Sequence, residues 1–168
     1  GFSMGGNLVL KAAGEWGSSP PPEFRAVVAV CPAIDLAPSA DALHEPSNRL
    51  YEWYFVWKLR GRLRIKARLF PSHYDLGRLR GVRTLRQFDD KVTAFYCGFT
   101  GADDYYARAA AANVIDKISV PTLILHAAND PFIRILPGTR KKIAANRNIQ
   151  FIETHDGGHC SFVGELNG

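Results

Sequence analysis

Gly1-Phe2-Ser3-Met4-Gly5-Gly6-Asn7 opens the chain and decides how the rest is interpreted. It matches the pattern G-x-S-x-G, in which a serine lies on a strained turn between a strand and a helix with its hydroxyl presented outward. Glycines two residues either side let the strand and the helix approach closely, because they carry no Cβ. The motif therefore predicts Ser3 as a catalytic nucleophile.

The context of this turn is half visible in the sequence. Residues 7–16 have the apolar spacing of the helix that should follow the serine. The strand that should precede it would lie before Gly1, so we expect the chain to be the C-terminal part of a longer protein.

Three β-branched or aliphatic runs, at residues 24–31, 120–126 and 148–153, are typical of buried strands. Residues 138–146 between the last two runs predict a short amphipathic helix. Strands that alternate with helices predict an α/β fold built on a mostly parallel, doubly wound sheet.

The alternation stops between residues 36 and 112, where aromatic and basic helical stretches replace it. This segment is far longer than an ordinary connection between elements. We expect it to be a helical cap or lid inserted into a core made of residues 1–35 and 113–168.

Composition places the chain among globular proteins: 46% of its 168 residues are hydrophobic and 22% are charged. The longest apolar run, residues 26–34, is too short to span a bilayer. The cysteines Cys31, Cys97 and Cys160 are odd in number and lack metal-ligand spacing, which favours free thiols, no metal site and a cytoplasmic protein.

Two residues complete a catalytic triad in chain order. Asp130 follows the second strand, and Pro131 disfavours helix there. His159 follows the third strand, after two glycines. Serine, then acid, then histidine is the order of α/β-hydrolases, in which the histidine takes the serine proton and the carboxylate orients the imidazole.

The remaining assignments follow from this order. The Met4 N–H, directly after the nucleophile, is expected to be one oxyanion-hole donor. His155 is a weaker candidate for the base because it precedes the glycines. The other histidines are interpreted as structural: His44, His73 and His126.

Several motifs together resemble the YheT-like α/β-hydrolases: GFSMGGN at 1–7, FDD at 88–90, GADDYY at 101–106, VPTLIL at 120–125, NDP at 129–131 and GGH at 157–159. The resemblance covers almost the whole chain. It implies a serine hydrolase or esterase that acts on carboxylic or lipid esters without a cofactor, with Ser3, Asp130 and His159 as its catalytic residues.

Ten of the 21 Lys and Arg residues lie between Lys58 and Arg86, just after the aromatic run at 51–57. Three interpretations compete: a solvated face, a surface for anionic lipid or phosphorylated substrates, and a nucleic-acid site. We expect no nucleic-acid partner, because no recognition motif accompanies the charge. The second interpretation predicts a protein that is peripheral to membranes.

The sequence thus predicts a serine hydrolase that cleaves carboxylic esters through an acyl-enzyme. The alternatives are a cofactor-free perhydrolase or haloperoxidase-like enzyme and a non-catalytic lipid-surface binding module. We expect this segment alone to be inactive, because the strand before Ser3 and the second oxyanion donor would lie upstream.

Overall fold

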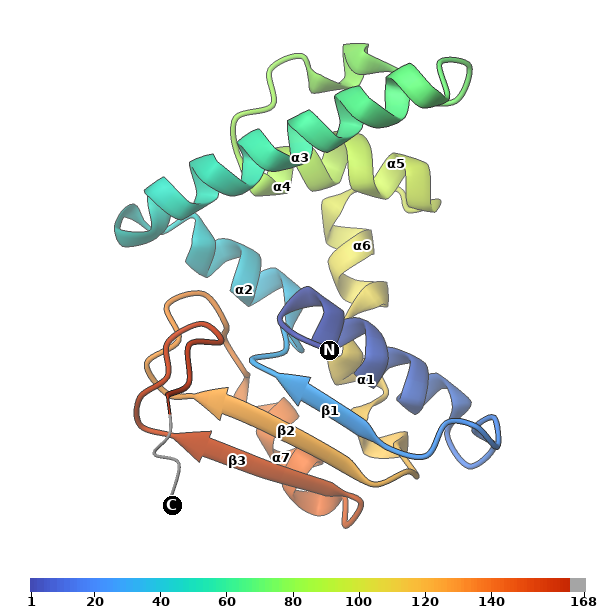
Figure 1. The fold of residues 1–168 in the computed structure, drawn as a ribbon, viewed down its shortest axis with the longest axis vertical. Coiled ribbons are helices and arrows are strands. Elements are labelled where there is room, and N and C mark those ends of the chain that lie inside the picture. The colour runs from blue at the N-terminus through green and yellow to red at the C-terminus, as the bar shows by residue number, and fades with distance from the viewer. Residues whose placement is uncertain (164–168) are drawn as a thin grey trace. The chain divides into compact units, whose positions relative to one another are not determined.

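Three strands rich in aliphatic residues form a parallel sheet in the computed structural model, which describes residues 1–163 (Figure 1). They are β1 (Val27–Val30), β2 (Thr122–Ala127) and β3 (Ile149–Thr154), in the spatial order β1-β2-β3. Ala29 lies opposite Ile124, which lies opposite Phe151. The predicted strands and the parallel α/β sheet are confirmed.

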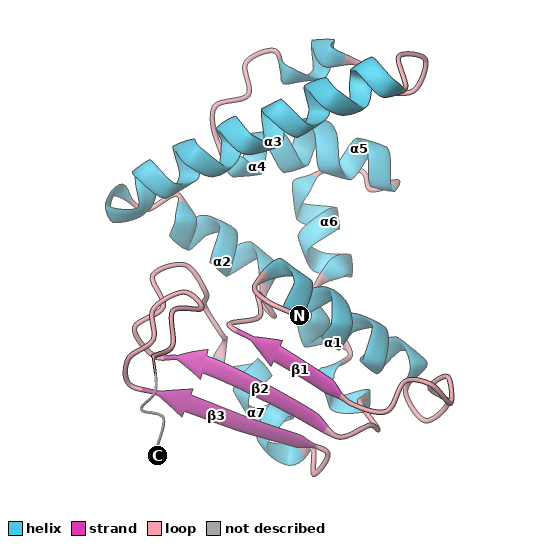
Figure 2. Cartoon of the chain, viewed as in Figure 1, coloured by secondary structure: helices cyan, strands magenta, loops and turns pink. Residues whose placement is uncertain are grey.

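Helices connect and cover these strands, as Figure 2 shows. Helix α1 (Met4–Trp16) precedes β1, and α7 (Pro137–Ala145) joins β2 to β3. Leu10 of α1 and Ile143 of α7 belong to one buried cluster with the inward residues of β1 and β2. The other members of this core are Ala13, Val27, Ala29, Ile34, Ala111, Ile115, Ile118, Val120 and Ile124.

Asn7 explains why the opening motif ends in a polar residue. Its side chain is completely buried within the first turns of α1. Its Oδ1 accepts a hydrogen bond from the Ala111 N–H at 2.8 Å, and its Nδ2 donates to the Ala109 carbonyl at 3.0 Å. Through these two hydrogen bonds to the main chain, the buried amide of Asn7 joins α1 to the segment that leads back to the sheet.

The chain divides into two units, which are described separately: residues 1–39 with 109–168 hold the sheet, and residues 40–108 are helical. The α-helices that lie wholly or partly within residues 40–108 are, in order, α2 (Leu36–Leu43), α3 (Arg49–Leu69), α4 (Leu85–Phe88), α5 (Ala94–Cys97) and α6 (Ala102–Ala109). A π-helical turn, Asp89–Thr93, joins α4 to α5.

Helix α3 resolves an ambiguity in the sequence, because its basic residues recur at every second position as in a strand. The segment is helical, and Glu52, Val56 and Leu63 form its buried stripe. Val56 and Leu63 pack with Leu79, Val82, Phe88 and Val92 in the core of the helical unit. The helical spacing of these buried positions, four and seven residues apart, outweighs the alternation of charge.

The FDD and GADDYY motifs contact each other inside the helical unit. The Tyr106 hydroxyl donates to Asp89 Oδ2 at 2.7 Å, and the Ala102 N–H donates to Asp90 Oδ1 at 3.1 Å. Burial raises the pKa of Asp89, which the hydrogen bonds from Thr93 and Tyr106 oppose. These motifs therefore have a structural explanation within residues 40–108.

None of the helices in residues 1–163 combines the length and the apolar character needed to cross a membrane.

Candidate active site

Ser3 occupies a strained turn between the sheet and α1. Its φ of 51° and ψ of −122° are unfavourable for a residue with a Cβ. The turn is held from both sides: the Ser3 N–H donates to the Val30 carbonyl at 2.9 Å, and the Ala33 N–H donates to the Ser3 carbonyl at 3.2 Å. Such strain at a serine is typical of a functional site.

The glycines around Ser3 differ in what they make room for. A Cβ on Gly1 would lie 2.4 Å from the Gly5 carbonyl oxygen, so Gly1 is needed for close approach. A Cβ on Gly5 would meet nothing within 4 Å in the described structure, and the expectation for that glycine is wrong. Gly6 takes this role instead, since its Cβ would lie 2.8 Å from the Pro32 Cβ.

Gly6→Ala is therefore expected to lower the free energy of unfolding by about 1–3 kcal/mol, because a rigid proline ring cannot move aside. Gly5→Ala, one residue earlier in the same helix, is the matched control. It should leave stability unchanged or raise it by at most about 1 kcal/mol. Urea unfolding of both variants measures the difference, and equal losses would contradict this account of the turn.

Asp130 lies in the loop after β2 and is only 4% exposed. Its Oδ1 accepts hydrogen bonds from the backbone N–H groups of Phe132 (2.9 Å) and Ile133 (3.0 Å). Burial raises its pKa, but the hydrogen bonds from His159, Ile133 and Phe132 outweigh burial, so the pKa of Asp130 is lowered overall. Asp130 is therefore ionised at neutral pH, with Oδ2 left to face His159.

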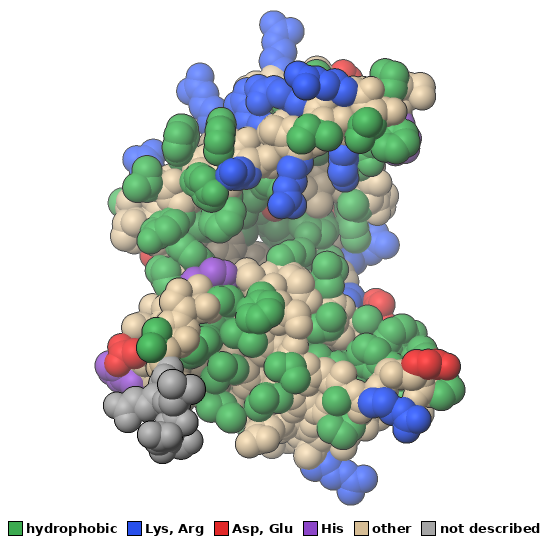
Figure 3. Space-filling model, viewed as in Figure 1, with side chains coloured by type: hydrophobic (Ala, Val, Ile, Leu, Met, Phe, Trp, Pro, Cys, Tyr) green, Lys and Arg blue, Asp and Glu red, His purple; other side chains and the backbone are tan. Residues whose placement is uncertain are grey.

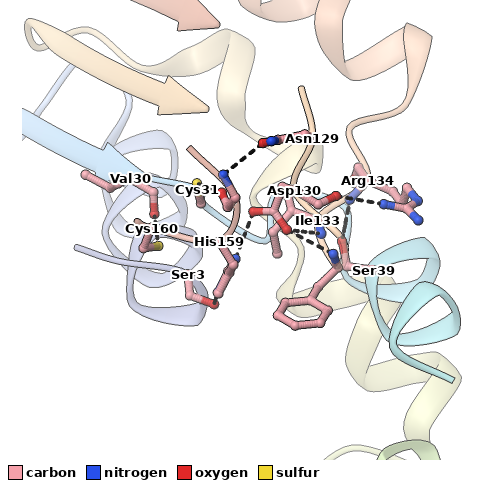
Figure 4. A network of polar contacts seen from close by, with 12 residues as sticks. Ser3, Val30, Cys31, Ser39, Asn129, Asp130, Ile133, Arg134, His159 and Cys160 are labelled. Atoms are coloured by element: carbon pink, nitrogen blue, oxygen red, sulfur yellow. Dashed lines mark hydrogen bonds and ion pairs between the residues drawn. The ribbon is translucent and has the colours of Figure 1, made fainter. Parts of the chain in front are cut away.

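His159 lies between Ser3 and Asp130 (Figure 4). Its Nδ1 is 2.8 Å from Asp130 Oδ2 and its Nε2 is 2.9 Å from Ser3 Oγ. An ionised carboxylate only accepts, so Nδ1 carries the proton and Nε2 of the neutral ring accepts the Ser3 O–H. The structure brings together the three residues that the sequence singled out, from the ends of three separate segments.

Asn129 holds the loop that carries His159, a role that no pattern in the sequence predicts. Its Oδ1 accepts from the Gly158 N–H at 2.8 Å and its Nδ2 donates to Asp156 Oδ1 at 3.1 Å. Gly157 and Gly158 have φ values of 143° and 52°, which favour glycine. The ring of Phe132 lies edge-on to the imidazole, with centroids 5.1 Å apart.

Three of the other histidines contact residues outside this group. His155 is exposed, and its Nδ1 lies 3.0 Å from Asp156 Oδ2, a contact that raises the pKa of His155. His44 pairs with Glu52 at 2.8 Å, and His73 packs against Tyr74.

His126 is buried at the end of β2, and burial lowers its pKa. Its Nδ1 has no hydrogen-bond partner among the residues that the structure describes.

Two thiols lie beside these residues. Cys31 follows β1 with a φ of 42°, and Cys160 follows His159 with a φ of 64°. Burial raises the pKa of Cys31 to about 12 and also raises that of Cys160. Both side chains are therefore protonated at neutral pH, and neither is in the nucleophilic thiolate form.

Met4 begins α1 directly after the strained serine. The first N–H groups of a helix have no intrahelical partner and carry the positive end of the helix dipole. The Met4 N–H therefore lies at the N-terminus of α1, next to Ser3 in the chain. Its role as an oxyanion-hole donor stays a prediction from the sequence.

No family model matches the chain, but curated proteins do. It is 30% identical over 168 residues to "Putative esterase YheT" of Escherichia coli, covering 98% of this chain and 48% of that protein. It is 27% identical over 164 residues to Phospholipase ABHD3 of Mus musculus, covering 97% of this chain and 39% of that one. Monoacylglycerol lipase ABHD2 of Danio rerio is 27% identical over 175 residues, with 96% and 41% covered.

These similarities confirm the resemblance predicted from the motifs and the α/β-hydrolase fold. The chain spans about half the length, or less, of the curated relatives that it matches.

Proposed function

We propose, from the premise that this chain is similar over nearly its whole length to YheT-like α/β-hydrolases, that the protein hydrolyses carboxylic esters through Ser3. The observation that carries the proposal is the continuous chain of hydrogen bonds from Asp130 through His159 to Ser3. The names of the relatives, which include esterase, phospholipase and monoacylglycerol lipase, support an ester substrate and favour a lipid ester.

The reaction follows from the positions of these atoms. His159 Nε2 takes the proton as Ser3 Oγ attacks the acyl carbonyl, and the imidazolium then protonates the leaving alcohol. Water attacks the resulting acyl-enzyme with His159 again as the base. Asp130 stays ionised and stabilises the imidazolium through Nδ1–H, because its own pKa is lowered.

The negative charge that develops on the carbonyl oxygen in the transition state is stabilised by hydrogen-bond donors that are already in position. The Met4 N–H at the start of α1 supplies one of them in this proposal. Removing one such donor typically costs about 10²–10³ in kcat, so a second N–H elsewhere in the full-length protein is expected.

The test is labelling of the full-length protein with a fluorophosphonate, which reacts only with an activated serine, followed by identification of the modified peptide. Modification of Ser3 supports the proposal and leads to a screen of esters by acyl-chain length. Absence of labelling in folded protein would overturn it. Formation of peracid from acetate and peroxide, in preference to ester hydrolysis, would point instead to a perhydrolase.

A lipid ester raises the question of how the protein reaches its substrate, and we propose that α3 binds an anionic membrane surface. Trp53 and Trp57 are 63% and 53% exposed and stack with centroids 6.5 Å apart. Basic residues follow them along the same helix: Lys58, Arg60, Arg62, Arg64, Lys66 and Arg68. Within residues 1–163 these six form no salt bridge with a carboxylate, and Figure 3 shows blue and green side chains interspersed over the helical unit.

Arg62→Gln/Arg64→Gln is expected to weaken binding to anionic vesicles by at least about tenfold, since each basic residue near such a surface contributes about 1 kcal/mol. Lys141→Gln/Arg147→Gln, which removes the same charge from the sheet unit, is the matched control. Vesicle sedimentation at two salt concentrations measures both variants, and binding should weaken as salt rises. Equal binding to neutral vesicles, or equal losses in both variants, would contradict the proposal.

A further inference from the structure

Cys31 and Cys160, whose thiols have no part in the proposed reaction, lie with His159 as a group of metal-type donors. Among residues 1–163, one donor atom from each of these three side chains lies within 4.8 Å of the other two. The residues come from two loops that are far apart in the sequence, one after β1 and one after β3. Sequence spacing therefore gave no sign of the group.

The hydrogen bonds that the Cys31 and Cys160 thiols make in this structure are long and weak. Cys31 Sγ lies 3.6 Å from the Gly158 carbonyl oxygen, and Cys160 Sγ lies 3.6 Å from that of Val30. Thiol hydrogen bonds are weak, so a metal would displace little besides the two thiol protons, which pass to solvent as the Zn–S bonds form and make binding tighter at higher pH. Cys160 is half-buried and the His159 side chain is 19% exposed, which gives an ion a path from solvent.

The donor types select the metal. Two sulfurs and an imidazole suit Zn²⁺, whereas Mg²⁺ and Ca²⁺ require oxygen. With Zn–S of about 2.3 Å and Zn–N of about 2.0–2.1 Å, neighbouring ligands of a tetrahedral ion lie about 3.5–3.8 Å apart. The three donors need to move inward by about 1 Å at most, and Gly157 and Gly158 give the His159 loop that freedom.

We propose that Cys31, Cys160 and His159 form an inhibitory Zn²⁺ site beside Ser3. Both ring nitrogens of His159 are already engaged, with Asp130 and with Ser3. A metal on either nitrogen breaks one of these hydrogen bonds and removes the base from the reaction. The fourth position of the ion is left for water. Inhibition rests on the proposed hydrolase function, but binding of the metal does not.

Binding is measured on the full-length protein kept reduced with a phosphine, by competition with a chromogenic zinc chelator. Co²⁺ in place of Zn²⁺ should give a sulfur-to-metal charge-transfer band in the near ultraviolet. Cys160→Ser should weaken binding by at least about tenfold and reduce this band. Cys97→Ser, which changes the exposed cysteine of the helical unit, is the matched control and should bind as the wild type does. Cys31→Ser is a second variant, and Cys160→Ser decides the matter if that buried replacement does not fold.

Inhibition is measured separately, as loss of ester hydrolysis with Zn²⁺, recovery with a chelator and no effect of Mg²⁺. Binding that is unchanged in Cys160→Ser, or lost equally in Cys97→Ser, overturns the inference and leaves the hydrolase proposal standing. Zinc binding through Cys160 without any hydrolysis would instead support the site while contradicting the proposed function.

Discussion

Ser3→Ala is expected to lower kcat for ester hydrolysis by about 10⁶ and to abolish labelling by a fluorophosphonate. The loss is this large because, in the proposed reaction, Oγ forms the covalent bond to the acyl group, and no other group in the described site is placed to do so. Cys31 and Cys160 are the nearest alternatives, but burial raises the pKa of both thiols. Steady-state kinetics with a chromogenic short-chain ester measures the change.

The control for this variant is Ser18→Ala, an exposed serine in the loop after α1. It should keep full activity and full labelling. The strained φ at Ser3 adds a second check: alanine keeps the Cβ, so the turn should be retained and unfolding should change little. Hydrolysis that persists in Ser3→Ala, with the probe on a different serine, would refute the assignment.

Asp130→Asn is expected to lower kcat by about 10⁴ with little change in the fold. Asparagine can keep its Oδ1 as the acceptor for the N–H groups of Phe132 and Ile133. It then presents an NH₂ group to His159 Nδ1, so the imidazole takes the tautomer with its proton on Nε2. That tautomer cannot accept the Ser3 proton. A loss of less than tenfold would show that Asp130 does not orient the base.

The same substitution also changes how stability depends on pH. Because the pKa of folded Asp130 lies below its unfolded value of about 3.9, its stabilisation is complete above that value. It is lost as pH falls through the lower, folded pKa. Asp130→Asn should therefore flatten the pH dependence of unfolding below about pH 4. Urea unfolding at neutral and acidic pH compares the variant with the wild type, and parallel acid profiles would contradict the lowered pKa.

How far the sequence predicts the site depends on where each residue lies relative to a strand. Asp130 and His159 each follow an apolar strand, and Ser3 follows Phe2, which forms a parallel bridge to Val30 of β1. Parallel strands bring their carboxyl ends to one edge of a sheet. The apolar runs that mark strands, together with the glycine or proline residues that follow them, therefore predict that the three side chains lie close together. The bounds of β1, β2 and β3 differ from the predicted runs by one to three residues at their ends.

What the sequence could not predict depends on contacts between loops. Asn129 holds the His159 loop only because two turns approach each other after β2 and β3. Gly6, rather than Gly5, allows the close approach because of the position of Pro32, which follows a different strand. Neither the Asn129 contacts nor the Gly6–Pro32 contact produces a periodic pattern in the sequence. The FDD and GADDYY motifs marked the family resemblance without indicating that Asp89 and Tyr106 pair.

Ser3 and His159 are separated by 156 residues along the chain, yet only 2.9 Å separates their side-chain atoms. Closing so long a loop is entropically costly and becomes favourable only after the intervening contacts exist. A chain emerging from the ribosome passes through its whole helical unit before the imidazole can meet the hydroxyl. The proposed nucleophile therefore lacks its proposed base until the chain has been synthesised at least as far as His159.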